Sequence, residues 1–246
     1  MRTVVVVPTY DEAENIVLLL EAVRSAAPDV DVMVVDDNSP DGTGDLAQKA
    51  GEELGRISVL RRESKTGLGN AYRHAFRVAL EEGYEIVVTM DADFSHDPAV
   101  IPELVAAIEG GADVAIGSRY VPGGATPNWP VYRQALSRYG NLYAGWLLGL
   151  RMRDATAGFR AYRADLLRDI RYDTSKANGY TFMTELAYRM SLVRAQVVEV
   201  PITFADRVRG TSKMSAFIIG EAMGRVTWWG LKLRANRARG IDAVPA

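Results

Sequence analysis

The first half of this 246-residue chain alternates short apolar runs with longer amphipathic segments, and that alternation restricts the possible folds most. The short runs are rich in β-branched residues and predict buried strands at residues 4–7, 32–35, 57–60, 86–90 and 114–116. Helical patterns lie between them at residues 14–26, 45–54, 69–82 and 99–109. Such alternation predicts a three-layer α/β sandwich with a mainly parallel sheet. Ligands of these sheets bind beyond the carboxyl ends of the strands.

The second half of the chain has a different pattern. Residues 132–150, 180–194 and 215–239 are helical in pattern, residues 120–130 predict a mobile loop rich in Gly and Pro, and residues 197–204 predict an edge strand containing Pro201. We therefore expect one domain over residues 1–213. A C-terminal amphipathic helix with a basic tail follows over residues 214–246. Trp228 and Trp229 precede the basic residues, so this part is a candidate for contact with a membrane, with core burial as the alternative.

Three single-residue interpretations accompany these patterns. Thr9 and Glu12 have the spacing of a capping box at a helix start. Trp146 is expected in the core. His96 is expected at the entry to a helix; the alternatives are that it binds the metal or supports the residues that do.

Composition excludes several classes of protein. The net charge of −2 gives no sign of a nucleic-acid partner. With no cysteine, disulfides and thiolate zinc sites are excluded. No run reaches the roughly 18 uncharged apolar residues that a spanning helix needs. The first residues enter a strand pattern and lack the features of a secretory signal.

Acidic residues follow three of the predicted strands: Asp11 and Glu12, Asp36 and Asp37, and Asp91 and Asp93. Any one pair could be a helix cap or a solvated loop. Three pairs at neighbouring strand ends instead indicate a ligand site. Asp91 and Asp93 leave their strand at positions i and i+2, so both carboxylates project to the same side. Together they can hold a hard divalent cation that also binds substrate phosphate.

A rival signal is the sequence Gly42-Thr43-Gly44, which matches part of a dinucleotide-binding fingerprint. Three nearby carboxylates would repel a bare pyrophosphate, and the motif follows the second predicted strand instead of the first. We therefore favour a turn that leads into a helix.

Several motifs resemble those of the family-2 glycosyltransferases of GT-A fold, and within them the polyprenyl-phosphate (dolichyl-phosphate-type) mannose synthases. They are residues 7–12, 35–43, 67–69, 90–96, 117–120, 158–163 and 206–213. The last motif carries the resemblance to the polyprenyl-phosphate branch.

The resemblance implies an inverting, metal-dependent transfer of a sugar, most simply mannose from GDP-mannose, to a polyprenyl monophosphate, with Mg²⁺ or Mn²⁺ as cofactor. It implies a nucleoside site, a diphosphate and metal site, and a set of phosphate-binding cations that also act in catalysis. The nucleoside site would contain Pro8, Tyr10, Glu12, Val35 and Asp37. Asp91, Ala92 and Asp93 would lie at the diphosphate, with Asp91 and Asp93 binding the metal. The cations would be Arg119, Arg207 and Lys213, with Arg133 as a weaker candidate.

The same resemblance implies a cytoplasmic enzyme, peripheral to the inner face of the membrane. Some relatives use a separate integral membrane subunit, which we keep as an expected partner. Transfer of glucose, or transfer to another acceptor, is the nearest alternative. A non-catalytic module that binds nucleotide sugars and a dehydrogenase are the alternatives from other classes.

Overall fold

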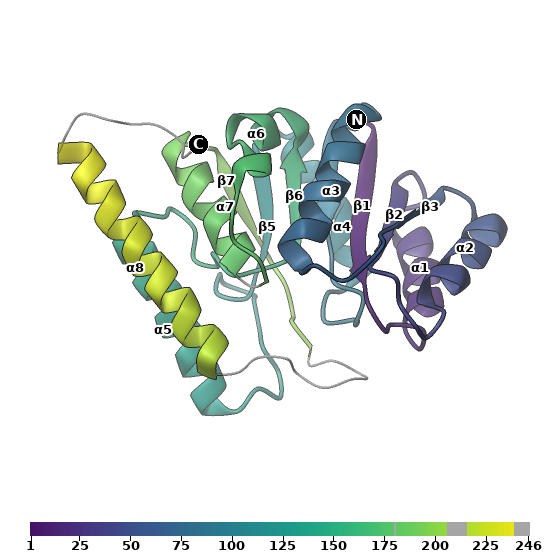
Figure 1. Ribbon diagram of the computed structural model, residues 1–246, viewed down its shortest axis with the longest axis horizontal. Helices are drawn as coiled ribbons and strands as arrows, with labels where there is room; N and C mark the ends of the chain where they lie inside the picture. The colour runs from purple at the N-terminus through teal and green to yellow at the C-terminus, as the bar shows by residue number, and fades with distance from the viewer. Residues whose placement is uncertain (180, 206–215, 239–246) are drawn as a thin grey trace.

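The computed structural model describes residues 1–179, 181–205 and 216–238. Within these ranges seven strands form one sheet, in the order β3-β2-β1-β4-β6-β5-β7 (Figure 1). The strands are β1 (Thr3–Thr9), β2 (Asp31–Asp36), β3 (Ile57–Arg61), β4 (Ile86–Thr89), β5 (Val114–Ser118), β6 (Arg160–Arg163) and β7 (Val197–Pro201). All pairings are parallel except those of β6, so the expected mainly parallel sheet is confirmed.

Strand β6 was not predicted from the sequence. It runs antiparallel to both β4 and β5 and lies between them. Its four residues are Arg160, Ala161, Tyr162 and Arg163, so they contain no apolar run that would mark a buried strand. Strand β7 pairs with β5 alone and lies at the end of the sheet order, as Pro201 indicated.

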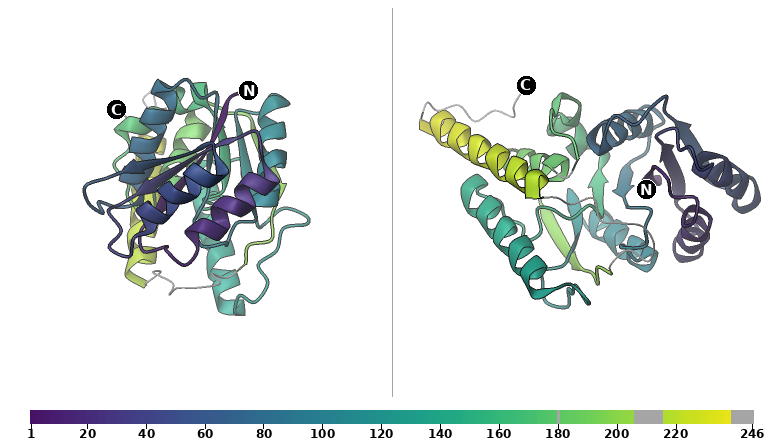
Figure 2. Two further views of the ribbon diagram at one scale, coloured as in Figure 1. Left: turned by 90° about the vertical axis from the view of Figure 1, so that its right-hand side faces the viewer. Right: turned by 60° about the horizontal axis from the view of Figure 1, so that its bottom comes forward.

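Helices cover both faces of the sheet (Figure 2). Alternate residues of the strands pack on opposite sides, which gives two separate apolar cores. One core joins the sheet to α1 (Ile16–Ala26), α2 (Thr43–Leu54) and α4 (Ile101–Glu109), the last preceded by the 3₁₀ helix η1 (Pro98–Val100). The other joins it to α3 (Leu68–Glu81), α6 (Ala164–Asp169), α7 (Thr181–Leu192) and the 3₁₀ helix η2 (Tyr172–Thr174). The predicted three-layer architecture is thus confirmed.

Two long helices, α5 (Val131–Leu148) and α8 (Ala216–Ala238), pack against each other beside this sandwich (Figure 1). Their axes approach closely because Gly230 has no side chain: a Cβ there would lie 2.4 Å from Leu147. Tyr143 and Thr227 join the helices by a 2.7 Å hydrogen bond between hydroxyls. The ring of Trp229 stacks on Tyr188 of α7 and ties the pair to the domain.

Some local predictions are wrong. Thr9 is part of β1, and its hydroxyl donates to Val35 and Asp36, so it caps no helix; α1 begins only at Ile16. Trp146 is 72% exposed because α5 turns other residues toward α8. The expected loop at residues 120–130 is confirmed as irregular backbone, in which Ala125 exchanges backbone hydrogen bonds with residues 202 and 204; its mobility stays a prediction.

No helix within the described ranges is long and apolar enough to cross a membrane.

Candidate active site

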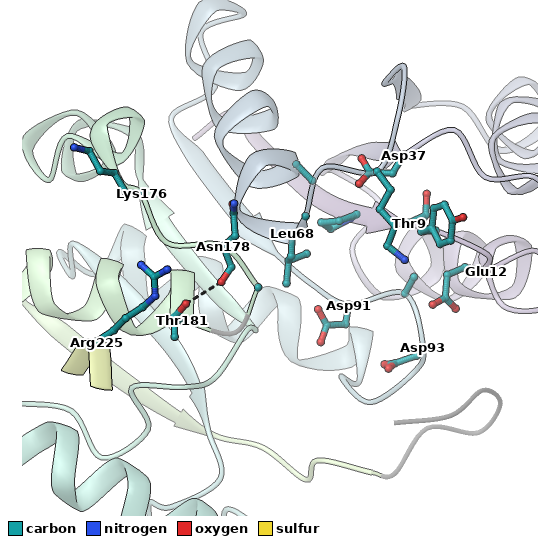
Figure 3. A pocket seen from close by; sticks show the side chains of 17 residues that line it. Thr9, Glu12, Asp37, Leu68, Asp91, Asp93, Lys176, Asn178, Thr181 and Arg225 are labelled. Carbon is teal, nitrogen blue, oxygen red and sulfur yellow. Dashed lines mark hydrogen bonds between the residues drawn. The ribbon is translucent and has the colours of Figure 1, made fainter. Parts of the chain in front are cut away.

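A cavity of about 470 Å³ opens at the carboxyl ends of β1, β2 and β4, and we call it the central pocket. Segments far apart in the sequence line it: Pro8, Thr9, Tyr10, Glu12, Asp37, Lys65, Gly67, Leu68, Ala71, Asp91, Ala92, Asp93, Lys176, Asn178, Gly179, Thr181 and Arg225. Figure 3 shows how the labelled charged residues are arranged around this pocket. Asp37 and Glu12 lie on one side, Lys176 and Arg225 lie on the other, and Asp91 lies between them. The predicted gathering of the three acidic strand ends is therefore present.

The turn that follows β4 is held by hydrogen bonds along its length. The Asp91 backbone N–H donates to Nδ1 of His96 over 3.1 Å, and the Ser95 N–H donates to Oδ1 of Asp93 over 3.1 Å. The His96 ring is buried and stacks on Phe159 at 5.0 Å. These contacts fix the backbone that carries both carboxylates.

His96 is thus a structural acceptor within this turn and does not mark the entry to the helix, which Asp97 caps through the Ala99 N–H. Burial lowers the pKa of His96, although the negative charge of Asp91 opposes the shift. A neutral ring with an unprotonated Nδ1 is the form that can accept the Asp91 N–H.

Strand β6 brings a distant motif to the same turn. The Thr89 hydroxyl donates to the carbonyl oxygen of Gly158 over 2.6 Å, and a Cβ on that glycine would lie 3.7 Å from an Asp91 carboxylate oxygen. The buried Tyr72 interacts electrostatically with this site: burial raises its pKa well above the ordinary value, and the charge of Asp91 adds to the shift. The segment that carries the carboxylates is therefore packed against buried, hydrogen-bonded residues.

Of the two carboxylates after β2, only Asp37 lines the central pocket. Asp36 instead closes its own turn, accepting the Ser39 hydroxyl over 2.6 Å. Asp37 is ion-paired with Arg62. Burial raises the pKa of Asp37 above its ordinary value, and the charge of Arg62 opposes the shift. Asp37 is consequently an acceptor held in place at the pocket wall.

An aromatic wall and a cation stand beside these acids. The Nζ atom of Lys65 lies 3.6 Å from the centroid of the Tyr10 ring, and both residues line the pocket. Glu12 accepts a hydrogen bond from the Asn15 amide over 2.9 Å. A ring next to fixed carboxylates can recognise a base and the hydroxyls of a ribose.

The motif Gly42-Thr43-Gly44 forms a turn that leads into a helix, as expected from the sequence. Helix α2 begins at Thr43, whose backbone N–H donates to Asp41 over 3.0 Å. Asp41 also accepts the Ala13 N–H over 2.9 Å, so this carboxylate occupies the start of the helix.

Several predicted site residues lie elsewhere. Val35 is fully buried in β2 and does not line the pocket. Arg119 is bound by Asp154 through two hydrogen bonds of 2.7 and 2.6 Å, and it does not line the central pocket. Arg133 lies on α5 with its guanidinium 3.9 Å from the centre of the Trp129 ring. Arg207 and Lys213 lie outside the described residues.

Some pocket residues were missed from the sequence: Lys65, Ala71, Lys176, Asn178, Thr181 and Arg225. The glycines of the 67–69 motif were a signal for part of this set. A Cβ on Gly69 would lie 2.6 Å from the carbonyl oxygen of Ala177, so only glycine lets α3 approach the segment that carries Lys176. Arg225 had no such signal, because its place depends on how α8 packs.

Asp91 and Asp93 fit a cation that draws its other ligands from substrate or water. Within residues 1–179, 181–205 and 216–238 no group of three or more His, Cys, Asp or Glu residues could hold a metal ion alone. Two carboxylates with phosphate oxygens form a common ligand set for hard divalent cations.

A mainly parallel sheet, helices on both faces and a carboxylate pair after β4 define the class of the GT-A glycosyltransferases. The sequence model described as Glycosyl transferase family 2 matches residues 4–171. The chain belongs to this family, and the expected family and fold are confirmed.

Two full-length relatives are similar to the chain. It is 49% identical over 234 residues to an undecaprenyl-phosphate mannosyltransferase of Micrococcus luteus, covering 95% of this chain and 96% of that one. It is 48% identical over 241 residues to a polyprenol monophosphomannose synthase of Mycolicibacterium smegmatis, covering 98% and 91%.

Solved structures share the fold at lower identity. Glucosyl-3-phosphoglycerate synthase of Mycobacterium tuberculosis superposes with a TM-score of 0.67 at 20% identity, covering 94% of this chain and 79% of that one. A mannosyltransferase of Pyrobaculum calidifontis, in complex with GDP-Man and Mn²⁺, gives 0.59 at 17% identity, covering 96% and 75%.

Proposed function

We propose that this glycosyltransferase transfers mannose from GDP-mannose to the phosphate of a polyprenyl monophosphate. The observation that carries the proposal is the charge pattern of the central pocket, with the acids, Tyr10 and Lys65 on one side and Lys176 and Arg225 on the other. The first side suits a nucleoside, and the second suits an acceptor phosphate. The names of the two relatives, both at 48–49% identity, support the sugar and the acceptor.

The donor is proposed to bind along the strand ends. Pro8, Tyr10 and Glu12 would contact the base and ribose together with Asp37. Asp91 and Asp93 would hold Mg²⁺ or Mn²⁺ at the diphosphate next to Ala92. A cation bound there neutralises charge that develops on a leaving diphosphate. His96 acts through the backbone of Asp91 and keeps the two carboxylates in position.

The acceptor needs no general base in this proposal. A hydroxyl must lose a proton during attack, whereas a phosphate monoester has a second pKa of about 6 and is largely a dianion at neutral pH. The task of the protein is then to bring two anions together, which requires cations. Lys176 and Arg225 line the pocket, while Arg207 and Lys213 remain sequence predictions for the same role. Arg119, bound to Asp154, remains a predicted phosphate contact.

A panel of nucleotide sugars tests the function. Purified protein is incubated with a polyprenyl monophosphate and GDP-mannose, GDP-glucose, UDP-glucose or UDP-N-acetylglucosamine. We expect mannosyl lipid and GDP only from GDP-mannose, loss of turnover with a chelator, and recovery with Mg²⁺ or Mn²⁺. Glucosyl lipid as the main product would contradict mannose as the sugar, and transfer only to an acceptor without phosphate would contradict a polyprenyl monophosphate as the acceptor.

We also propose that the enzyme lies on the membrane surface through α5 in addition to α8. Large apolar side chains with exposures of 45–73% recur every three or four residues on α5, at Tyr132, Leu136, Tyr139, Leu142 and Trp146, and Val131 beside them is 82% exposed. The opposite side of α5 is buried against α8. An exposed apolar stripe with nearby arginines is typical of a helix lying in a bilayer interface.

We expect the triple variant Tyr139→Ser, Leu142→Ser, Trp146→Ser to bind vesicles containing anionic lipids at least about tenfold more weakly. Burying one such side chain is worth roughly 1.5–3 kcal/mol, and the variant removes three. Sedimentation with vesicles measures the effect. The matched control is Leu18→Ser, Leu46→Ser, which removes exposed apolar side chains from α1 and α2. If the unchanged protein does not sediment with vesicles of lipid alone, the stripe is a docking surface for a membrane protein instead.

A further inference from the structure

A second cavity, of about 620 Å³, lies between α7 and α8, and we call it the α7–α8 groove. Its lining residues are Thr174, Lys176, Glu185, Tyr188, Arg189, Gly224, Arg225, Trp228, Trp229 and Lys232. Lys176 and Arg225 line both this groove and the central pocket. The two cavities therefore meet at a pair of cations.

The charge of the groove is positive. Its one described acid, Glu185, is buried and bound by Arg189 through contacts of 2.9 and 2.8 Å. Beside that pair the lining contains Lys176, Arg225 and Lys232, so its basic residues outnumber its acidic ones. A phosphate is the ligand that such a set favours.

The segment carrying Lys176 is fixed on both sides. Ser175 donates its hydroxyl to Glu185 over 2.9 Å, and the Ala177 N–H donates to the same carboxylate oxygen over 2.9 Å. Arg73 adds a 3.0 Å hydrogen bond to the Ala177 carbonyl. Glu185 thus holds the backbone on either side of Lys176, which fixes the position from which the Lys176 side chain extends.

Arg225 is placed by the packing of α8. Its neighbour Val226 is buried against α5, and one turn later Trp229 stacks on Tyr188 with ring centroids 6.1 Å apart. Trp228 lines the groove while 66% exposed, which offers an aromatic face to an apolar chain. The groove therefore has a cationic end at the central pocket and an aromatic wall beyond it.

We propose that the α7–α8 groove binds the isoprenoid monophosphate acceptor, with its phosphate between Lys176 and Arg225 and its apolar chain along Trp228. The proposal rests on the proposed function for the identity of the acceptor. It places the acceptor phosphate across the pocket from Asp37 and Glu12 (Figure 3). Because α8 packs on α5, the groove also connects the active site with the helix pair proposed to meet the membrane.

The test measures binding and turnover separately. Calorimetry gives the dissociation constant of citronellyl monophosphate, a short water-soluble isoprenoid, for the full chain without donor. Steady-state kinetics give the KM of acceptor and donor. Arg225→Gln and Lys176→Gln should each raise the dissociation constant and the acceptor KM at least about tenfold, since each loses a charge-assisted contact. The donor KM should stay unchanged.

Three further variants test the roles of charge and of the aromatic wall, and supply a control. Arg225→Lys keeps the charge and should recover part of the affinity. Trp228→Ser should change citronellyl phosphate binding little but remove the gain in affinity that longer isoprenoid chains give. Lys49→Gln removes an exposed charge from α2, away from both cavities, and should behave as the unchanged protein.

Each outcome decides between the proposals. If acceptor binding is unchanged in both Arg225→Gln and Lys176→Gln, the acceptor does not bind in the α7–α8 groove, even if mannose is transferred normally. Binding of citronellyl phosphate without sugar transfer, weakened in these variants, sustains the groove and rejects the proposed function. If inorganic phosphate binds as tightly as the isoprenoid phosphate, the proposed contact between the isoprenoid chain and Trp228 is rejected.

Discussion

Asp93→Asn is expected to reduce turnover by at least about a hundredfold while the protein stays folded. The change removes one negative oxygen at the proposed metal site and keeps the size of the side chain. Charge on the departing diphosphate then remains less well neutralised, and each 1.4 kcal/mol on the barrier costs about tenfold in rate. Turnover with saturating GDP-mannose and Mn²⁺ measures the loss, and circular dichroism verifies the fold.

The matched control lies four residues further on. Asp97 is exposed and caps η1 through the Ala99 N–H at 2.9 Å, and asparagine caps a helix equally well. Asp97→Asn removes the same charge from the same segment and should leave turnover unchanged. Equal turnover of Asp93→Asn and Asp97→Asn with GDP-mannose and Mn²⁺ would rule out Asp93 as a metal ligand.

The largest expected loss of stability is in Asp154→Ala, at about 3–5 kcal/mol. Asp154 is fully buried and accepts hydrogen bonds from the Arg119 backbone N–H at 3.1 Å and from its guanidinium at 2.7 and 2.6 Å. Without this carboxylate a buried arginine charge loses its partner. Urea unfolding followed by fluorescence measures the change.

A double variant separates the ion pair from simple loss of packing. Arg119→Leu combined with Asp154→Ala removes more atoms, but it also removes the uncompensated charge from among Tyr120, Trp129 and Phe204. We expect it to be more stable than Asp154→Ala alone. A double variant that is less stable than the single one would show that the pair is not the source of the loss.

The same pair predicts a dependence on pH. Burial tends to raise the pKa of Asp154, but the charge and hydrogen bonds of Arg119 outweigh burial and lower it. The folded state therefore binds this proton less readily than the unfolded state does. Its contribution to stability is present above the unfolded pKa of about 3.9 and disappears as the pH falls through the lower folded pKa. Below about pH 4 the unchanged protein should lose stability more steeply than Asp154→Ala.

The sequence alone determined the parts of this protein that depend on local pattern. Short β-branched runs and amphipathic segments predicted strands β1 to β5 and the helices that cover them, because burial on one or both faces imposes a period on the chain. The position of Asp91 and Asp93 directly after a buried strand predicted their place in a pocket. Parallel strands bring their carboxyl ends to one edge, so no further information was needed.

Tertiary structure decided what depends on the meeting of distant segments. It placed β6 between β4 and β5, and so Gly158 beside Asp91, although these residues are far apart along the chain. It also joined Arg119 to Asp154, outside the lining of the pocket to which its charge alone would assign it.

The cations of the central pocket were decided in the same way. Lys176 and Arg225 come together because Gly69 lets α3 approach one segment and Gly230 lets α8 approach α5. The sequence around a lysine or arginine does not reveal its use, because the same side chain suits a solvated surface, an ion pair or a phosphate site equally well. Only the packing of the helices selects among these uses, because it decides which charges face a shared cavity and which are neutralised by a partner.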